Sequence, residues 1–191
     1  MKKIILLIMA IAFESFAAYF DIGAGDGTGL ISVKGEDLST GALVGNNKGC
    51  DDDCLVPSIE YGARIGTPLT QSLIIAGEFD GFSNLLVQDG KYAVFNSFMV
   101  GPSVIFYPAK HFQVSGSLGF AWTDNRTNSG AVDVENGQGV GFSLSAAFDT
   151  GINNGALIGA KIYGTSVKLE DSDDISASVG ASIFVRFVHK K

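Results

Sequence analysis

The sequence is poor in charge, in proline and in reactive side chains. Only 17% of its 191 residues are charged, and it holds four prolines, two cysteines, two histidines and one tryptophan. So low a charge argues against a disordered chain. After the first twenty residues no apolar run reaches 18 residues, which excludes membrane-spanning helices. A net charge of −7 argues against binding of nucleic acid through phosphates.

Glycine and apolar residues take the place of what is missing. The chain contains 25 glycines and is 46% hydrophobic. Glycine is unfavourable inside helices, so this composition argues against a helical bundle. The length suits a single domain.

The first 17 residues have the layout of a secretory signal. Lys2 and Lys3 precede an apolar run at 4–13, and the stretch at 15–17 places small residues, Ser15 and Ala17, at the cleavage positions. We expect cleavage after Ala17, which leaves residues 18–191 as one exported domain. The alternative, an anchor helix, is disfavoured because ten apolar residues cannot cross about 30 Å of hydrocarbon.

Export also determines how the two cysteines are interpreted. Cys50 and Cys54 enclose three aspartates, Asp51, Asp52 and Asp53. In an oxidising compartment so close a pair predicts a local disulfide. A metal site is the alternative. Only these five residues offer ligands, however, and no histidine is near. The three aspartates are therefore only weak candidates for binding a cation.

From residue 18 onward the apolar residues recur with period two, the pattern of β-strands with two different faces. Eight such segments predict an all-β chain. Pro102 falls inside the fourth segment and predicts a bulge or an irregular ladder there. The connectors between segments are expected at 26–56, 66–71, 81–91, 108–111, 123–138, 150–155 and 164–174.

Long and short connectors therefore alternate along the chain. This alternation is typical of outer-membrane barrels, whose periplasmic turns are short and whose external loops are long. Aromatic residues near strand ends, Tyr19, Tyr107, Phe112 and Trp122, favour the same class. We predict an eight-stranded antiparallel up-and-down transmembrane β-barrel. A secreted soluble β-sandwich that binds a ligand would show the same alternation of faces and stays open as an alternative.

Three stretches support a family resemblance. They are YFDIGAG at 19–25, GPSVIFYP at 101–108 and GASIFVRF at 180–187. With the signal and the eight strands, they resemble the small OmpA/OmpX-type outer-membrane barrels. The resemblance implies that Phe187 belongs to the terminal aromatic signal read by the barrel-assembly machinery, although residues 188–191 follow it here. It also implies that both mature termini are periplasmic.

The face opposite the apolar one carries the charges within these segments. Its members are Asp21, Glu60, Arg64, Glu78, Lys161 and Arg186, three acids and three bases. An eight-stranded barrel is just wide enough for side chains to fill it, so we expect these residues to form an interior ion-pair network. They either plug the barrel or line a narrow polar pathway.

No residue pattern indicates catalysis or a cofactor. His111 and His189 fall on the periplasmic side, away from the outer rim where barrel enzymes place their histidine. We expect a monomer with a structural, envelope-integrity or surface-interaction role. Its expected partners are outer-membrane lipid and an external partner that contacts the loop at 26–56. The alternative is a narrow porin-like channel for small solutes.

Overall fold

Nine antiparallel β-strands make up the computed structural model, which describes residues 19–33, 36–37, 56–88, 91–128, 135–151, 154–170 and 174–190. The strands are β1 (Tyr19–Val33), β2 (Glu36–Asp37), β3 (Val56–Pro68), β4 (Leu73–Gln88), β5 (Lys91–Ala109), β6 (Phe112–Thr127), β7 (Gly137–Asp149), β8 (Asn154–Leu169) and β9 (Ile175–Lys190). Within these ranges no helix is long and apolar enough to cross a membrane.

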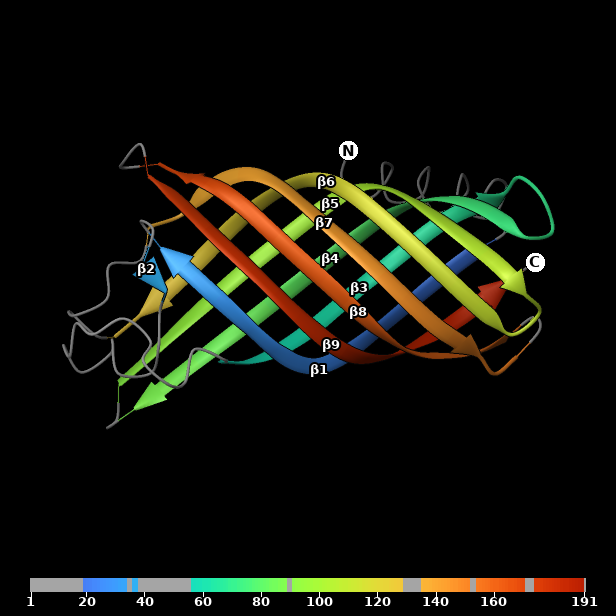
Figure 1. Cartoon of the computed structure of the whole chain (residues 1–191), viewed down its shortest axis with the longest axis horizontal. Coiled ribbons are helices and arrows are strands. Elements are labelled where there is room, and N and C mark those ends of the chain that lie inside the picture. Colours follow the sequence, from blue (N-terminus) through green and yellow to red (C-terminus); the bar gives the residue numbers. More distant parts are fainter. Residues whose placement is uncertain are drawn as a thin grey trace, which may run out of the picture.

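Eight of the strands close into a barrel (Figure 1). Each pairs with its neighbour in sequence, β2 pairs only with the end of β1, and β1 pairs along its whole length with β9. Closure leaves the barrel wall without a free edge, as a sheet surrounded by lipid requires. The predicted eight-stranded up-and-down barrel is confirmed. The alternative β-sandwich is wrong, because one closed sheet replaces two stacked ones.

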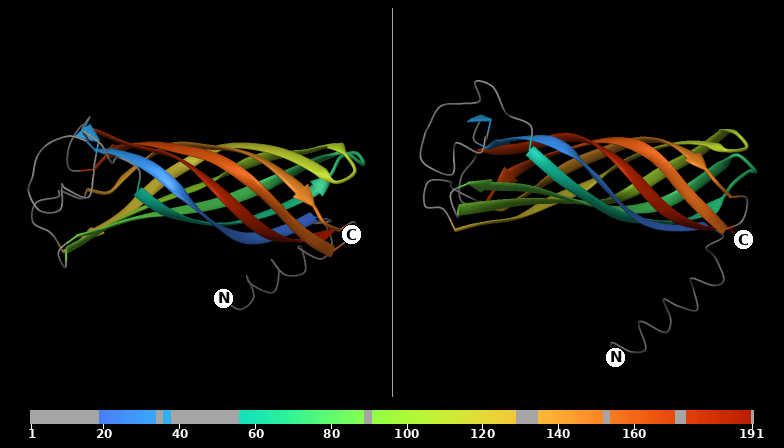
Figure 2. Two further views of the ribbon diagram at one scale, coloured as in Figure 1. Left: turned by 60° about the horizontal axis from the view of Figure 1, so that its bottom comes forward. Right: turned by 90° about the horizontal axis from the view of Figure 1, so that it is seen from below.

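The pairing of β1 with β9 places the first and the last residues of the described chain side by side, at the same end of the barrel. Tyr19 lies opposite Lys190, and Val33 lies opposite Ser176. Figure 2 shows the C-terminus at one end of an elongated barrel. We call this the terminal end, and the other the distal end.

Every expected loop overlaps the end of at least one strand; β8, for example, continues to Leu169 within 164–174. The overlap is longest within 26–56 and 81–91. Within 26–56, β1 continues to Val33 and β2 follows at Glu36–Asp37. Within 81–91, β4 continues to Gln88 and β5 already begins at Lys91. Both stretches mix glycine and polar residues with apolar ones, so the period-two signal fades although the ladder continues. The distal connection at 89–90 is therefore short, and the expected alternation of loop lengths fails there.

The apolar side chains of the alternating pattern point outward. Exposed members occur on every strand of the barrel wall, and Ile183 and Phe187 are exposed by 70% and 68%. The buried polar and charged side chains point into the barrel. This is the reverse of a soluble protein and the arrangement of a barrel surrounded by lipid. Several charged residues depart from it: Asp26 in the extension of β1, Arg126 in β6 and Lys168 in β8 all lie exposed on the outer side.

The ladder is irregular around Pro102, as the sequence suggests. Pro102 pairs with Gly77 of β4, whereas the β5–β6 ladder is interrupted between Val100 and Ser103 and resumes in the same register. The register shift in this pair of strands lies nearer the terminal end, between Phe106 and Ala109.

Candidate functional site

Seven charged side chains meet inside the barrel and form what we call the interior charge network. Each is exposed by 2% or less. The members are Asp21 of β1, Glu60 and Arg64 of β3, Glu78 and Asp80 of β4, Lys161 of β8 and Arg186 of β9. The structure thus places all six charged residues predicted from the sequence in one cluster and adds a seventh, Asp80.

Lys161 connects opposite walls of the barrel. Its Nζ lies 2.8 Å from Asp80 Oδ1, 3.3 Å from Glu78 Oε1 and 2.9 Å from Glu60 Oε1. Three strands separate β8 from β4 in either direction around the wall. The side chain of Lys161 therefore extends across the full width of the lumen, from β8 to the carboxylates of β4.

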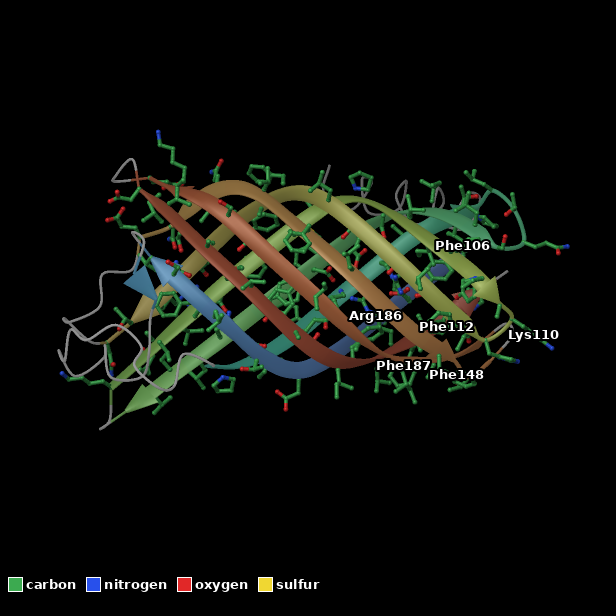
Figure 3. All side chains as sticks on the ribbon, in the orientation of Figure 1. Phe106, Lys110, Phe112, Phe148, Arg186 and Phe187 are labelled. Atoms are coloured by element: carbon green, nitrogen blue, oxygen red, sulfur yellow. The ribbon has the colours of Figure 1, made fainter. Side chains whose placement is uncertain are left out.

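Arg186 joins the two parts of the network. Its Nη1 lies 3.1 Å from Asp21 Oδ1, and its Nη2 lies 3.0 Å from both Glu60 Oε1 and Asp80 Oδ1. The neighbouring residue Phe187 points outward, so consecutive residues of β9 serve the lumen and the outer surface (Figure 3).

Arg64 fills the lumen toward the terminal end. Its guanidinium contacts Asp21 Oδ2 at 2.7 Å and donates to Ser115 Oγ at 2.8 Å and to Gln113 Oε1 at 3.0 Å. Ser115 and Gln113 belong to β6, so this side chain also reaches across the barrel. Tyr19 donates a hydrogen bond to Asp21 beside it.

Two of the aromatic residues assigned to the strand ends point inward. Tyr19 is buried in the lumen, and Tyr107 accepts a hydrogen bond from Gln113 Nε2 at 2.7 Å. The alternation of faces along a strand already indicated this orientation. Tyr19 lies two residues before the inward Asp21 and therefore on the same face, and Tyr107 follows the outward Phe106 and therefore lies on the opposite face. Parity also places Asp80 beside Glu78, although the balanced set of three acids and three bases omits it.

Side chains fill the lumen on both sides of the charge network. Toward the terminal end, apolar side chains pack around Arg64 and Gln113, with Ile74, Ile105, Leu157 and Val188 all buried. Toward the distal end Phe82 of β4 stacks on Tyr163 of β8, with ring centroids 3.5 Å apart. This stack joins the same opposite walls as Lys161, so a second layer crosses the lumen.

Four outward phenylalanines form an aromatic belt near the terminal end. Phe106, Phe112, Phe148 and Phe187 come from β5, β6, β7 and β9 and are all exposed (Figure 3). Of the aromatic residues expected at strand ends, only Phe112 belongs to this belt. Aromatic side chains of this kind are typical of the two edges of a lipid bilayer.

The remaining candidates lie away from the charge network or outside the described residues. His111 lies in the turn between β5 and β6, where its ring stacks on Phe148, and the exposed His189 is at the end of β9. Cys50, Cys54, residues 51–53 and the expected cleavage site at Ala17 all lie outside the described residues. In the ranges that the structure describes, no group of three acidic, histidine or cysteine residues could hold a metal ion.

No family model matches the sequence, and a comparison with curated proteins finds no match. Solved structures do match. Ail, the attachment invasion locus protein of Yersinia pestis, solved with the heparin analogue sucrose octasulfate, is 15% identical. It has a TM-score of 0.53 over 87% of this chain and 97% of its own. Neisserial surface protein A is 11% identical, with a TM-score of 0.51 over 90% and 97%.

OprG, an outer membrane protein of Pseudomonas aeruginosa, is 9% identical, with a TM-score of 0.52 over 92% of this chain and 98% of its own. This chain has the fold of the small outer-membrane barrels. At these identities the likeness concerns the fold and leaves the individual functions with the proteins named. The small-barrel fold agrees with the inside-out distribution of polar and apolar side chains described above.

Proposed function

We propose that this chain is a bacterial outer-membrane barrel with a closed lumen, which acts as a structural element and presents its distal connections to the outside. The outward apolar face and the aromatic belt support contact with outer-membrane lipid. The inward charges support a lumen sealed by side chains.

The observation that carries this proposal is the bridging of opposite walls inside the barrel. Lys161 and Tyr163 of β8 both contact residues of β4, Asp80 and Phe82. A continuous aqueous pathway would require lining residues that water can reach, whereas the charge network is exposed by 2% or less. An ion-pair plug is therefore favoured over a channel.

The distal connections supply the surface for an external partner. The longest of them joins β1 to β3 and includes the aspartates at 51–53. The structure of Ail is that of a complex with the heparin analogue sucrose octasulfate. An acidic segment repels sulfate groups, so we propose that a partner of this connection presents cationic groups.

Assembly and topology follow from the same proposal. Phe187 is exposed on the last strand, beside the end of the described barrel, where it is open to recognition by the barrel-assembly machinery. Export by a cleaved signal, periplasmic termini and a monomeric state complete the proposed picture.

One observation favours the alternative, a narrow channel. Asn84 is buried on the distal side of the Phe82–Tyr163 stack, and neither its Oδ1 nor its Nδ2 has a hydrogen-bond partner. Buried polar groups of this kind usually bind water. Water in this part of the lumen would be the first part of a pathway.

Electrical conductance across planar bilayers separates the two functions. The mature protein is refolded in lipid, and a mobility shift between boiled and unboiled samples on a detergent gel establishes that the barrel is folded. We expect no discrete current steps from folded protein. Reproducible steps that disappear after boiling would replace the closed barrel with the channel.

A further inference from the structure

The interior charge network contains more negative than positive groups. Its four carboxylates are Asp21, Glu60, Glu78 and Asp80, whereas its cations are Arg64, Lys161 and Arg186. With every group ionised, the network carries a net charge of −1. An uncompensated charge in so buried a place is strongly unfavourable.

The excess is located at two of the four carboxylates. Both oxygens of Asp21 are occupied, by Arg186 on one side and by Arg64 and Tyr19 on the other. Both oxygens of Glu60 are also occupied, by Arg186 and Lys161 and by Ser182. The excess negative charge of the network is therefore not located at Asp21 or Glu60.

Glu78 and Asp80 are each left with one oxygen unsatisfied. Glu78 Oε2 and Asp80 Oδ2 are buried and have no hydrogen-bond partner. The two residues lie two positions apart on β4, so both side chains point into the lumen from the same strand. Two of the cations already contact several acids each, Lys161 three and Arg186 four.

We propose that Glu78 and Asp80 together hold one proton at neutral pH, which makes the interior charge network neutral. The proton lies on one of the two unsatisfied oxygens, so that this carboxyl group becomes a hydrogen-bond donor. A metal ion fits less well, because the ammonium of Lys161 already lies between Asp80 Oδ1 and Glu78 Oε1, at 2.8 and 3.3 Å.

Among the residues that the structure describes, the surroundings of the pair contain no further cation that could take the place of this proton. β1 contributes Asp21 and Tyr19, β3 contributes Glu60 and Arg64, β8 contributes Lys161 and Tyr163, and β9 contributes Arg186. On β5 the residues paired with Asp80 and Glu78 are Met99 and Gly101. The neighbouring inward positions of β5, β6 and β7 carry the hydroxyls of Ser103, Ser117 and Ser143. Tyr107 and Asp149 face inward only at the terminal end.

The proposal goes beyond the proposed function, because a conducting lumen would face the same charge imbalance. It has a consequence for stability. In the unfolded chain these carboxyls are ionised at neutral pH, so the folded state binds one proton more than the unfolded state. Stability must then fall as the pH rises and this proton is lost.

Infrared spectroscopy of the refolded barrel at neutral pH tests the proposal directly. A protonated carboxylic acid has a carbonyl stretch separate from the bands of ionised carboxylates and amides. We expect this band in the wild-type protein and its loss in both E78Q and D80N, since either change removes one negative charge. The matched control is D124N, which changes an exposed aspartate and should keep the band.

A thermal series gives a second measurement. Between about pH 6 and about pH 9 the unfolding temperature of the wild-type barrel should fall, and that of D80N should fall less. Absence of the band from the wild-type protein would overturn the proposal, including where a metal ion is found bound instead. A band that persists in both E78Q and D80N would also overturn it, because the proton would then lie elsewhere. If the variants fail to fold, the wild-type spectrum alone decides.

Discussion

Gly62 shows how tightly a single residue of β3 is constrained by the charged side chains beside it in the lumen. A Cβ atom at this position would lie 2.4 Å from Asp80 Oδ1, 2.7 Å from the backbone oxygen of Phe79 and 3.1 Å from Arg186 Nη2. The absence of a side chain here is what permits Asp80 and Arg186 to meet.

Substitution of Gly62 by alanine should therefore destabilise the barrel. We expect a loss of about 1 to 3 kcal/mol, typical of overpacking, in urea unfolding of the protein in lipid vesicles. Gly77→Ala is the matched control, because a Cβ there meets nothing within 4 Å. Equal stability of the two variants would show that the interior is looser than the network requires.

Arg186 gives a sharper test of the plug. Arg186→Ala leaves Asp21, Glu60 and Asp80 without their shared cation, and loss of one member of a buried ion pair costs about 3 to 5 kcal/mol. We expect that loss in the same unfolding assay, without ion conductance, because Lys161 and Arg64 still cross the lumen.

The control for this substitution is Arg126→Ala. Arg126 pairs with Asp124 at 2.8 Å, but the two side chains are 71% and 44% exposed, so the pair is screened by solvent. A rise in conductance of Arg186→Ala with unchanged stability would identify Arg186 as a gate instead of a plug.

Individual residues also show how far the sequence was informative. Strict alternation assigned Asp21, Glu60 and Arg64 to one face, and the structure places all three buried in the lumen. The same alternation places Asp80 on the inward face two residues after Glu78, although the balanced set of three acids and three bases left it out. The cations that Asp80 contacts could not be predicted, because they depend on which strands face each other across the barrel. Nor could proximity to a strand end show that Tyr19 points inward to Asp21.

At the scale of the strands, the outward faces form an apolar band limited at each end. In β7 the outward residues run from Gln138 near the distal end, through Leu144, to Phe148 in the aromatic belt. The outward residues of this one strand therefore lie at one edge, in the middle and at the opposite edge of the apolar band.

This gradient predicts a dependence on depth. Leu144→Arg should cost about 2 to 4 kcal/mol in vesicles, as for a cation near the bilayer midplane, whereas Gln138→Arg should cost about 0 to 1 kcal/mol. Unfolding of both variants in the same lipid measures the difference. Equal effects at the two positions would argue that the middle of β7 does not contact hydrocarbon.

Strand lengths were the least predictable feature at this scale. The sequence ended the first segment at residue 25 and the third at residue 80, but β1 reaches Val33 and β4 reaches Gln88. In both extensions the outward face includes polar residues such as Asp26 and Ser83. Hydrogen bonding to neighbouring strands continues a ladder where the sequence pattern no longer marks one.

At the scale of the whole molecule, the sequence predicted the number of strands, their antiparallel order and the closed barrel. Two faces with opposite polarity left the barrel and the sandwich equally possible. Pairing of β1 with β9, which joins residues 143 to 171 positions apart, decides between them. Such a long-range contact has no local signature in a single sequence.

The central claim is that the apolar outer surface lies in lipid while the charges fill the interior. The single tryptophan of the chain, Trp122, reports on it, because it lies on the outward side of β6 and stacks on Phe98 with ring centroids 5.3 Å apart. The measurement is its fluorescence in vesicles whose acyl chains carry bromine. We predict strong quenching by these lipids and weak quenching by acrylamide in water. Strong quenching by acrylamide, with none by the brominated lipids, would contradict the account.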